Sequence, residues 1–290
     1  MIPFLEILFP KDLNEAFNAL SQSGRNVSII AGGTDIIPGF HQESQRFSNI
    51  ETLVDINALK EVRGIEIRNG KISIGAGETF SDILQNPIIE KELPLLWKAC
   101  STIGSVQIRN RATIAGNFVN NAPCADTVPP LLVYNATIEI ESLSSKREIT
   151  FNEFFSGPYK TKLNKDEIVT RINVPIPQKE LAGDFYKLGR RRAVAISRIT
   201  LAVLIKFQKD MIDEIRIASG AVTPIGIRFF DLEKFAKGKK ADDLFLKSLS
   251  GKLGEEILRV TGLRWSSAYK LPVVQQMFYQ LLKGIERRSL

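Results

Sequence analysis

Residues 113 to 127 read Thr-Ile-Ala-Gly-Asn-Phe-Val-Asn-Asn-Ala-Pro-Cys-Ala-Asp-Thr, and the rest of the chain is interpreted around them. An apolar run ends at Ile114, and small residues, amides, one acid and one proline follow it. So little side-chain bulk is unsuited to filling a core, and it suits a backbone that lies against a large polar ligand. A second turn of small residues, Ala31-Gly32-Gly33-Thr34-Asp35, lies about eighty residues upstream. We expect the two turns to grip one extended cofactor.

The composition is that of an ordinary globular protein. A length of 290 residues favours two domains, and 44% hydrophobic with 24% charged residues is typical of a folded chain. No run of about 18 apolar residues is present, which predicts no membrane span. The first residues lack a basic stretch followed by an apolar one, so we expect no signal peptide. Cys100 and Cys124 are too few for a disulfide framework, and we expect a cytoplasmic protein.

The formal net charge of +7 admits three kinds of partner: nucleic acid, an anionic ligand or an acidic protein subunit. The positive residues are mostly scattered, which favours a solvated surface, and the dense cluster is Lys187 to Arg192. No zinc-finger spacing, leucine-zipper heptad or ribonucleoprotein signature accompanies it. Nucleic-acid binding is therefore the weaker interpretation, and we predict no nucleic-acid partner.

The N-terminal segment predicts a helix, a strand and a turn. Residues 11 to 24 form an amphipathic pattern with Asp12 as N-cap and Gly24 as the stop, and residues 26 to 31 are rich in β-branched side chains. The strand leads directly into Gly32-Gly33-Thr34, where successive amide hydrogens can point the same way. Such a nest suits a diphosphate, and a plain tight turn is the alternative.

The next segment contains a hairpin and a false dinucleotide motif. A strand is expected over residues 48 to 56, and two more over 62 to 67 and 71 to 74 flank Asn69-Gly70, which favours a two-residue turn. Gly75-Ala76-Gly77 imitates a Rossmann fingerprint, but Phe80 stands where the third glycine belongs, so we interpret the motif as structural. Helices are expected from about residue 81 and over 93 to 102.

The second half changes character at residues 175 to 184, which contain two prolines and several polar residues. Before this segment we expect strands over 136 to 141 and 168 to 174, and a strand edge leading into a loop over 148 to 155. After it we expect three antiparallel strands over 185 to 189, 199 to 208 and 212 to 221, with a turn at Asp210-Met211. Helices follow over 229 to 235, 241 to 263 and 271 to 285. The sequence therefore predicts an α+β protein with domains over 1–177 and 178–290.

Side chains for acid–base or nucleophilic catalysis are scarce. His41 is the single histidine, so a histidine-based triad and a zinc site are both disfavoured, and no Walker loop is present. We predict no catalytic residue and no metal site in this chain. Amide donors are expected from the turn at 32–34 and from Thr113, Gly116 and Asn117. Asp126 is a candidate partner for a sugar hydroxyl, away from the phosphates because of its charge.

A family resemblance rests on separated motifs that follow one another along nearly the whole chain. They are Ala-Gly-Gly-Thr-Asp-Ile at 31–36, Gln-Ile-Arg-Asn at 107–110, Thr-Ile-Ala-Gly-Asn at 113–117, Ala-Asp at 125–126, Tyr-Lys-Leu-Gly-Arg-Arg-Arg at 186–192, Arg-Ile-Ala-Ser-Gly-Ala-Val-Thr-Pro at 216–224 and Leu-Arg-Trp-Ser-Ser-Ala-Tyr-Lys at 263–270. In this order they resemble the FAD-binding subunit of molybdenum hydroxylases, the family of xanthine dehydrogenase, carbon monoxide dehydrogenase and 4-hydroxybenzoyl-CoA reductase.

The resemblance implies a set of FAD contacts. Residues 29–36 would wrap the diphosphate and ribityl region, residues 113–117 would approach from a second lobe, Ile103 and Val169 would be apolar contacts, and Asp126 and Lys187 polar ones. The full set is Ile29, Ile30, Ala31, Gly32, Gly33, Thr34, Asp35, Ile36, Ile103, Thr113, Ile114, Ala115, Gly116, Asn117, Asp126, Val169 and Lys187. A lysine near the flavin would offset negative charge there.

The chain also departs from the family pattern. Ala115 replaces the first glycine of the usual Thr-Ile-Gly-Gly-Asn, which predicts an ordinary backbone at this position and the closest approach at Gly116. Two cysteines cannot supply the [4Fe–4S] cluster that some members carry, and we interpret Cys124 as a small packing residue. Three interpretations of the cluster at 187–192 stay open. Lys187 contacts the cofactor, Arg190 to Arg192 contact nucleic acid, or the cluster docks an acidic subunit.

The resemblance implies an FAD-binding electron-transfer subunit with two α/β lobes around the cofactor and a C-terminal antiparallel sheet with helices. A large subunit with the molybdenum cofactor would oxidise the substrate, a small subunit with [2Fe–2S] clusters would relay electrons, and NAD⁺ or another acceptor would receive them. A stand-alone flavin oxidoreductase and, more distantly, a basic nucleic-acid-binding protein are the alternatives.

Overall fold

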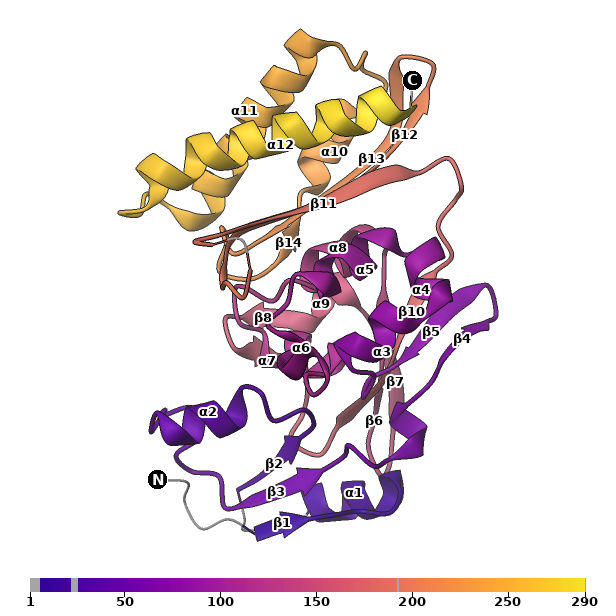
Figure 1. Ribbon diagram of the computed structural model, residues 1–290, viewed down its shortest axis with the longest axis vertical. Coiled ribbons are helices and arrows are strands. Elements are labelled where there is room, and N and C mark those ends of the chain that lie inside the picture. Colours follow the sequence, from indigo (N-terminus) through magenta and orange to yellow (C-terminus); the bar gives the residue numbers. More distant parts are fainter. Residues whose placement is uncertain (1–5, 22–25, 192, 290) are drawn as a thin grey trace.

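The computed structural model describes residues 6–21, 26–191 and 193–289. Figure 1 shows three parts along the long axis of the molecule: an N-terminal lobe, a second lobe in the middle and a C-terminal domain. Helices and strands are mixed throughout, which confirms the predicted α+β class.

The N-terminal lobe is built on a small parallel sheet with the order β1 (Glu6–Leu8), β3 (Thr52–Asp55) and β2 (Val27–Ile30). Helix α1 (Leu13–Leu20) begins at Asp12, whose side chain accepts a hydrogen bond from the Glu15 amide. The predicted N-cap is thus confirmed, and the predicted stop at Gly24 lies outside the described residues. Helix α2 (Ile36–His41) follows the turn after β2.

The second lobe contains an antiparallel sheet covered by short helices. Its strand order is β4 (Ile65–Arg68), β5 (Lys71–Gly75), β10 (Ile168–Pro175), β6 (Thr137–Glu141) and β7 (Lys146–Thr150). The other elements are η1 (Lys60–Val62), α3 (Phe80–Gln85), α4 (Pro87–Glu92), α5 (Pro94–Ser101), α6 (Val106–Arg109), α7 (Ile114–Asn120), α8 (Val128–Val133), α9 (Phe151–Phe154), β8 (Phe155–Gly157) and β9 (Lys160–Thr161).

In this lobe one local prediction from the sequence is confirmed and one is wrong. Asn69 and Gly70 both have positive φ, at 50° and 71°, and join β4 to β5, which confirms the predicted hairpin turn. The prediction of a strand edge running into a loop over 148–155 was wrong for its second half. Phe151 and Phe154 are buried in the core, and the chain between them forms the single helical turn α9.

The interpretation of residues 113–127 as a loop unsuited to a core also needs correction. Thr113 is the N-cap of helix α7, and its hydroxyl accepts a hydrogen bond from the Gly116 amide at 3.1 Å. Ile114 and Phe118 are buried one turn apart and pack into the core of the lobe. The stretch therefore starts with a helix that contributes to the core.

The C-terminal domain is an antiparallel sheet of β11 (Ala182–Gly189), β12 (Ser197–Gln208), β13 (Met211–Gly220) and β14 (Ile227–Arg228), with helices α10 (Phe230–Ala236), α11 (Asp243–Thr261) and α12 (Ser267–Ser289). The turn between β12 and β13 is at Lys209-Asp210, one residue earlier than predicted, because Lys209 takes the positive φ of 56°.

Strand β12 explains how the C-terminal domain joins the second lobe. Leu201 and Val203 on one face pack into the core that α10, α11 and α12 close, whereas Ala202 and Leu204 on the other face belong to the core of the second lobe. Because successive side chains of a strand point to opposite faces, a continuous apolar run can bury both. The sheet is thus a shared layer between two cores, as Figure 1 shows.

Candidate functional site

The turn after β2 presents backbone donors that the protein does not use. Within the described part of the chain, no amide N–H of residues 32 to 36 donates a hydrogen bond, whereas the carbonyls of Gly33 and Asp35 accept bonds from Ile37 at 3.1 Å and Gly39 at 2.9 Å. Gly33 has a φ of 71°. The Asn57 amide group donates to the Ala31 carbonyl and fixes the start of the turn. A run of unpaired N–H groups in such a turn is an anion-binding nest.

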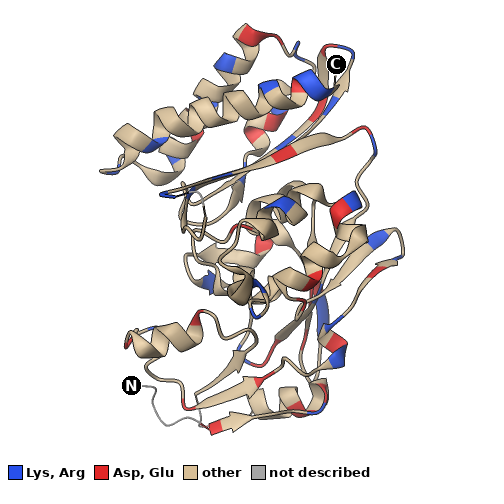
Figure 2. Cartoon of the chain, in the orientation of Figure 1, with Lys and Arg blue, Asp and Glu red and all other residues tan. Residues whose placement is uncertain are grey.

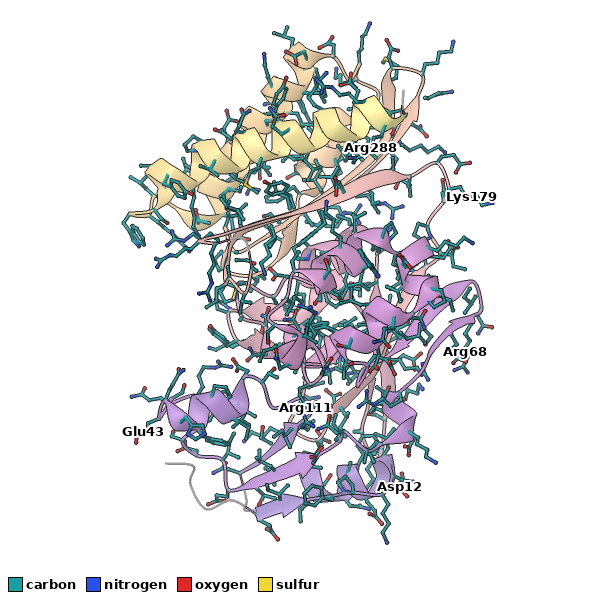
Figure 3. All side chains as sticks on the ribbon, viewed as in Figure 1. Asp12, Glu43, Arg68, Arg111, Lys179 and Arg288 are labelled. Carbon is teal, nitrogen blue, oxygen red and sulfur yellow. The ribbon has the colours of Figure 1, made fainter. Side chains whose placement is uncertain are left out.

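The same turn lies directly against the second lobe. A Cβ atom at Gly32 would be 2.1 Å from the Arg111 carbonyl oxygen and 2.8 Å from the Ala112 Cα atom. Glycine is therefore required here because two backbone segments from different lobes touch. Figure 3 places Arg111 between the N-terminal lobe and the second lobe. The two predicted turns are brought together through residues 111 and 112, which the sequence did not single out.

Two of the three amides that the sequence predicted as free donors at the start of α7, those of Gly116 and Asn117, are used within the helix. The amides of Ile114 and Ala115 donate to the carbonyls of Glu78 and Ala76 at 2.9 and 3.2 Å. Those of Gly116 and Asn117 donate to the Thr113 hydroxyl and carbonyl, both at 3.1 Å. The expectation that Gly116 and Asn117 are amide donors was therefore wrong, because the helix cap consumes them.

What α7 does offer is an exposed backbone and side-chain polarity. Gly116 is exposed, and a Cβ there would meet just the Thr113 hydroxyl, at 2.8 Å. Asn117 accepts a hydrogen bond from the Thr127 hydroxyl at 2.7 Å, which ties the helix to the following loop. Ala115 is helical and has no positive φ, so the predicted ordinary backbone at this position is confirmed.

Asp126 and Lys187 form a buried ion pair between the second lobe and the C-terminal domain. The Lys187 ammonium lies 2.7 Å from the Asp126 carboxylate and donates to the Thr102 carbonyl at 2.9 Å. The other carboxylate oxygen of Asp126, a residue 5% exposed, accepts from the Ser197 hydroxyl. Burial raises the pKa of the Asp126 carboxyl, and the Lys187 charge and the Ser197 hydrogen bond oppose that shift. Both charged groups thus have protein partners.

Some of the apolar residues in the predicted set are half-buried and others are fully buried in a core. Ile29 and Ile30 are half-buried on β2, and Ile36 is buried at the start of α2. Ile103 is half-buried next to Thr102, the residue that binds Lys187. Val169 is buried in β10, and the neighbouring Thr170 carbonyl accepts from the Ala76 amide at 3.0 Å.

Ala76 links strand β10 to helix α7, because its amide donates to the Thr170 carbonyl and its own carbonyl accepts from the Ala115 amide. The segment Gly75-Ala76-Gly77 has the structural role that the sequence predicted: a Cβ at Gly75 or Gly77 would meet the backbone or side chains of Val62 and Arg63.

Arg46 is a contact between lobes that the sequence analysis missed. Its guanidinium lies 3.3 Å from the Asp35 carboxylate and donates to the Asn120 side chain at the end of α7. It also stacks 4.0 Å from the centre of the Tyr159 ring in the second lobe and 4.7 Å from that of Phe47. No local motif signals such a residue, since its partners come from distant segments.

Cys124 lies beside Asp126, and burial followed by the Asp126 charge raises the pKa of its thiol. A raised pKa disfavours the reactive thiolate, in line with the interpretation of Cys124 as a packing residue. Among the described residues, no group of three histidine, cysteine or carboxylate side chains is placed to hold a metal ion.

The geometry of the turn after β2 suits an anionic group such as a diphosphate. Five successive N–H groups lack protein acceptors, and a glycine stands where a side chain would block the approach of the second lobe. Two surface hollows lie elsewhere: one is lined by Arg63, Glu78 and Asp82 among others, and one by residues of the α11–α12 turn, including Arg264 and Lys270.

Comparison with known families now gives these features a common context. Residues 4–177 match the family described as the FAD binding domain in molybdopterin dehydrogenase, and residues 184–285 match the CO dehydrogenase flavoprotein C-terminal domain. The chain therefore belongs to the family of FAD-binding subunits of molybdenum-containing dehydrogenases, which are oxidoreductases.

Individual relatives agree over nearly their whole length. The xanthine dehydrogenase FAD-binding subunit of Escherichia coli O157:H7 is 33% identical over 267 residues, covering 91% of this chain and 90% of that protein. The glyceraldehyde dehydrogenase medium chain of Sulfolobus acidocaldarius is 34% identical over 277 residues, covering 95% and 96%. A chain of carbon monoxide dehydrogenase from Hydrogenophaga pseudoflava superposes with a TM-score of 0.91 at 27% identity, covering 99% of both chains.

Within the described residues, none of the helices has both the length and the apolar character that crossing a membrane requires.

Proposed function

We propose that this chain is the FAD-binding electron-transfer subunit of a multi-subunit molybdenum hydroxylase. The observation that carries the proposal is the set of unpaired amides at residues 32–36, held against the second lobe by Gly32. The FAD-binding family, and relatives that are themselves named as subunits or medium chains, support it.

The turn after β2 binds the diphosphate in this proposal. The amides of Gly32, Gly33 and Thr34 donate to its oxygens, and the exposed Asp35 carboxylate is partly neutralised by Arg46. Residues 113–117 provide the facing surface of the second lobe, with Gly116 as the point of closest approach and the Asn117 side chain held by Thr127.

The remaining predicted residues shape the surroundings. Ile103 and Val169 contribute apolar walls, while Asp126 and Lys187 fix the position of the C-terminal domain beside the cofactor. Because the two charges cancel within the pair, Lys187 supplies no isolated positive charge to the cofactor. Its role is to hold the C-terminal domain in position. The FAD-binding domain extends over residues 1–177 and the flavoprotein C-terminal domain over 178–290.

FAD, when bound, supplies redox chemistry that links single-electron carriers to a two-electron acceptor. The residues of this chain bind it, orient it and set its electrostatic surroundings, and none acts as a proton-transfer catalyst. A large molybdenum-cofactor subunit and a small [2Fe–2S] subunit are the partners, NAD⁺ or another oxidant is the acceptor, and the complex works in the cytoplasm.

Reconstitution tests this assignment. The chain is co-expressed with a large molybdenum-cofactor subunit and a small [2Fe–2S] subunit from the same organism, and FAD content and substrate-dependent reduction of NAD⁺ and of artificial acceptors are measured. We expect about one FAD per copy of this chain and substrate-dependent reduction of an acceptor that disappears when this subunit is omitted. Transfer to the same acceptor without this subunit contradicts the electron-transfer role, and full turnover by this chain alone favours a stand-alone enzyme.

A further inference from the structure

One edge of the C-terminal domain combines unpaired positive charge with exposed apolar side chains. It is formed by the end of the β11–β12 loop with the first residues of β12, and by the α11–α12 turn with the first turn of α12. Its six residues, called the basic edge below, are Ile196, Arg198, Leu263, Arg264, Trp265 and Lys270. In Figure 1 both segments lie at the left end of this domain, and Figure 2 shows Lys and Arg at that end of β11.

The positive charge of the basic edge has no internal counterpart. Neither residues 185–206 nor residues 257–285 contain an aspartate or glutamate. Among the residues that the structure describes, Arg198, Arg264 and Lys270 take part in no ion pair. Burial lowers the pKa of the Lys270 ammonium, and the charges of Arg198 and Arg264 lower it further. The three positive charges are thus close enough to repel one another, and no carboxylate in these two segments neutralises them.

The apolar side chains of the same edge are unusually exposed. Ile196 is 79%, Leu263 is 85% and Trp265 is 91% exposed. Scattered apolar residues are normal on a surface, but a tryptophan next to arginines is the composition of energetic hot spots in protein interfaces.

The α11–α12 turn holds Trp265 in place without covering it. The Arg264 amide donates to the Ser267 hydroxyl and the Ser267 amide donates to the Arg264 carbonyl, both at 2.9 Å. Lys270 anchors the start of α12 by donating to the Ala221 carbonyl at 2.9 Å. A preorganised turn reduces the entropy lost when a partner binds.

We propose that the basic edge is the docking surface for a companion subunit that presents carboxylates around an apolar pocket. The inference rests on the proposed function, because it assigns a place to the partner that such a subunit needs. Charge complementarity selects an acidic partner. Branched aliphatic side chains gain little from a phosphate backbone and much from burial in a protein interface, which favours protein over nucleic acid.

The test changes charge and apolar area together at exposed positions. The double variant Arg264→Glu/Trp265→Ala is compared with Lys237→Glu/Leu244→Ala, which makes the same kinds of change near the opposite end of α11. Lys237 is the C-cap of α10, and Leu244, which is 82% exposed, lies in the first turn of α11. Helix α11 has 19 residues, which separates the two sites by roughly 27 Å. Association of each full-length variant with the purified companion subunits is measured at two salt concentrations, and its FAD content is measured in parallel.

The expected result is association weakened by about tenfold or more for Arg264→Glu/Trp265→Ala, as for truncation of a hot spot, with unchanged FAD content and an unaffected control. Wild-type association that weakens as salt increases supports the charge argument. Equal association of both variants with the companion subunits overturns the proposal. A variant Arg264→Glu/Trp265→Ala that loses binding to nucleic acid but still binds the companion subunits overturns it as well. Failure of the wild-type chain to take up FAD contradicts the proposed function but leaves the association readout intact.

Discussion

Gly32 is one of the residues at which the two lobes meet. Its Cα hydrogen faces the backbone of Arg111 and Ala112, and the amides that follow it have no protein acceptor. A side chain here would push the lobes apart at the place where we propose that the diphosphate binds, so the smallest residue is required for geometric reasons and not just for turn formation.

Replacing Gly32 with valine should weaken FAD binding by about 2–3 kcal/mol, roughly a hundredfold, because the new Cβ atom would lie 2.1 Å from a carbonyl oxygen. Flavin fluorescence titration measures the loss. Gly157→Ala is the matched control, since nothing lies within 4 Å of a Cβ at Gly157. Equal affinity of the valine variant and the control would remove the turn from the cofactor site.

At the scale of elements, the ion pair of Asp126 and Lys187 joins the loop after α7 to strand β11. Both side chains are almost fully buried, with 6% and 10% exposure. A buried pair of this kind is neutral as a unit, but either partner alone is a costly isolated charge.

Asp126→Asn and Lys187→Met should each destabilise the protein by about 3–5 kcal/mol, because each leaves one buried charge without a counterion. The double variant should be more stable than the sum of the two effects predicts. Urea unfolding of the four proteins gives this coupling energy. Strict additivity of the two single effects would show that the pair does not act as a unit.

Helix α5 contains Cys100, which is fully buried, and burial followed by the Asp126 charge raises the pKa of its thiol above the ordinary 9.0. The unfolded chain loses this proton near that value and the folded chain keeps it. The stability that the buried neutral thiol contributes is therefore complete below pH 9.0 and is lost as the pH rises further.

The free energy of unfolding should thus fall with rising pH above 9.0, and Cys100→Ala should make the fall shallower by about 1.4 kcal/mol per pH unit. Leu96→Ala on the same helix is the control, because it removes core volume without removing a titratable group. Urea unfolding between pH 9 and higher pH measures this dependence. If the free energy of unfolding of the Cys100 variant falls with pH as steeply as that of the wild type, the prediction is wrong.

Several elements were predictable because their signals are local. The Asn69-Gly70 hairpin and the Asp12 helix cap depend on residues a few positions apart. Helix α7 was missed because small and amide residues weaken the helical pattern, although Thr113 as cap and the buried Ile114 and Phe118 would have indicated it.

The contacts of the site itself could not be predicted in this way. The sequence singled out Gly32 and Asp126, but their partners Arg111, Ala112 and Ser197 are distant along the chain. Such pairings depend on how the lobes pack, which no local pattern encodes. The same holds for the helix cap, which uses the amides that composition alone suggested were free.

At the scale of the whole molecule, the N-terminal lobe is held to the second lobe by backbone contact at Gly32 and by the Arg46 side chain. Arg46 joins Asp35 on one side to Asn120 and the Tyr159 ring on the other. The cofactor site lies between these lobes in our proposal, so their spacing controls how well both sides can bind at once.

Arg46→Ala should lower FAD affinity by about 1–2 kcal/mol, roughly 5- to 30-fold. Without Arg46, part of the free energy of FAD binding is needed to fix the two lobes relative to each other. Calorimetric titration measures the change. Arg68→Ala, on the far side of the sheet at the end of β4, is the charge-matched control and should bind as wild type does. If both variants bind FAD equally well, Arg46 does not hold the lobes for the cofactor.

The most direct test of the central claim is titration of the purified, flavin-free chain with FAD, followed by absorbance and calorimetry. The account predicts saturation at one FAD per chain and a flavin spectrum that persists through gel filtration. FMN and riboflavin should bind more weakly, because they lack the diphosphate that the amides at residues 32–36 would receive. A chain that binds no FAD, or binds riboflavin as tightly as FAD, would contradict it.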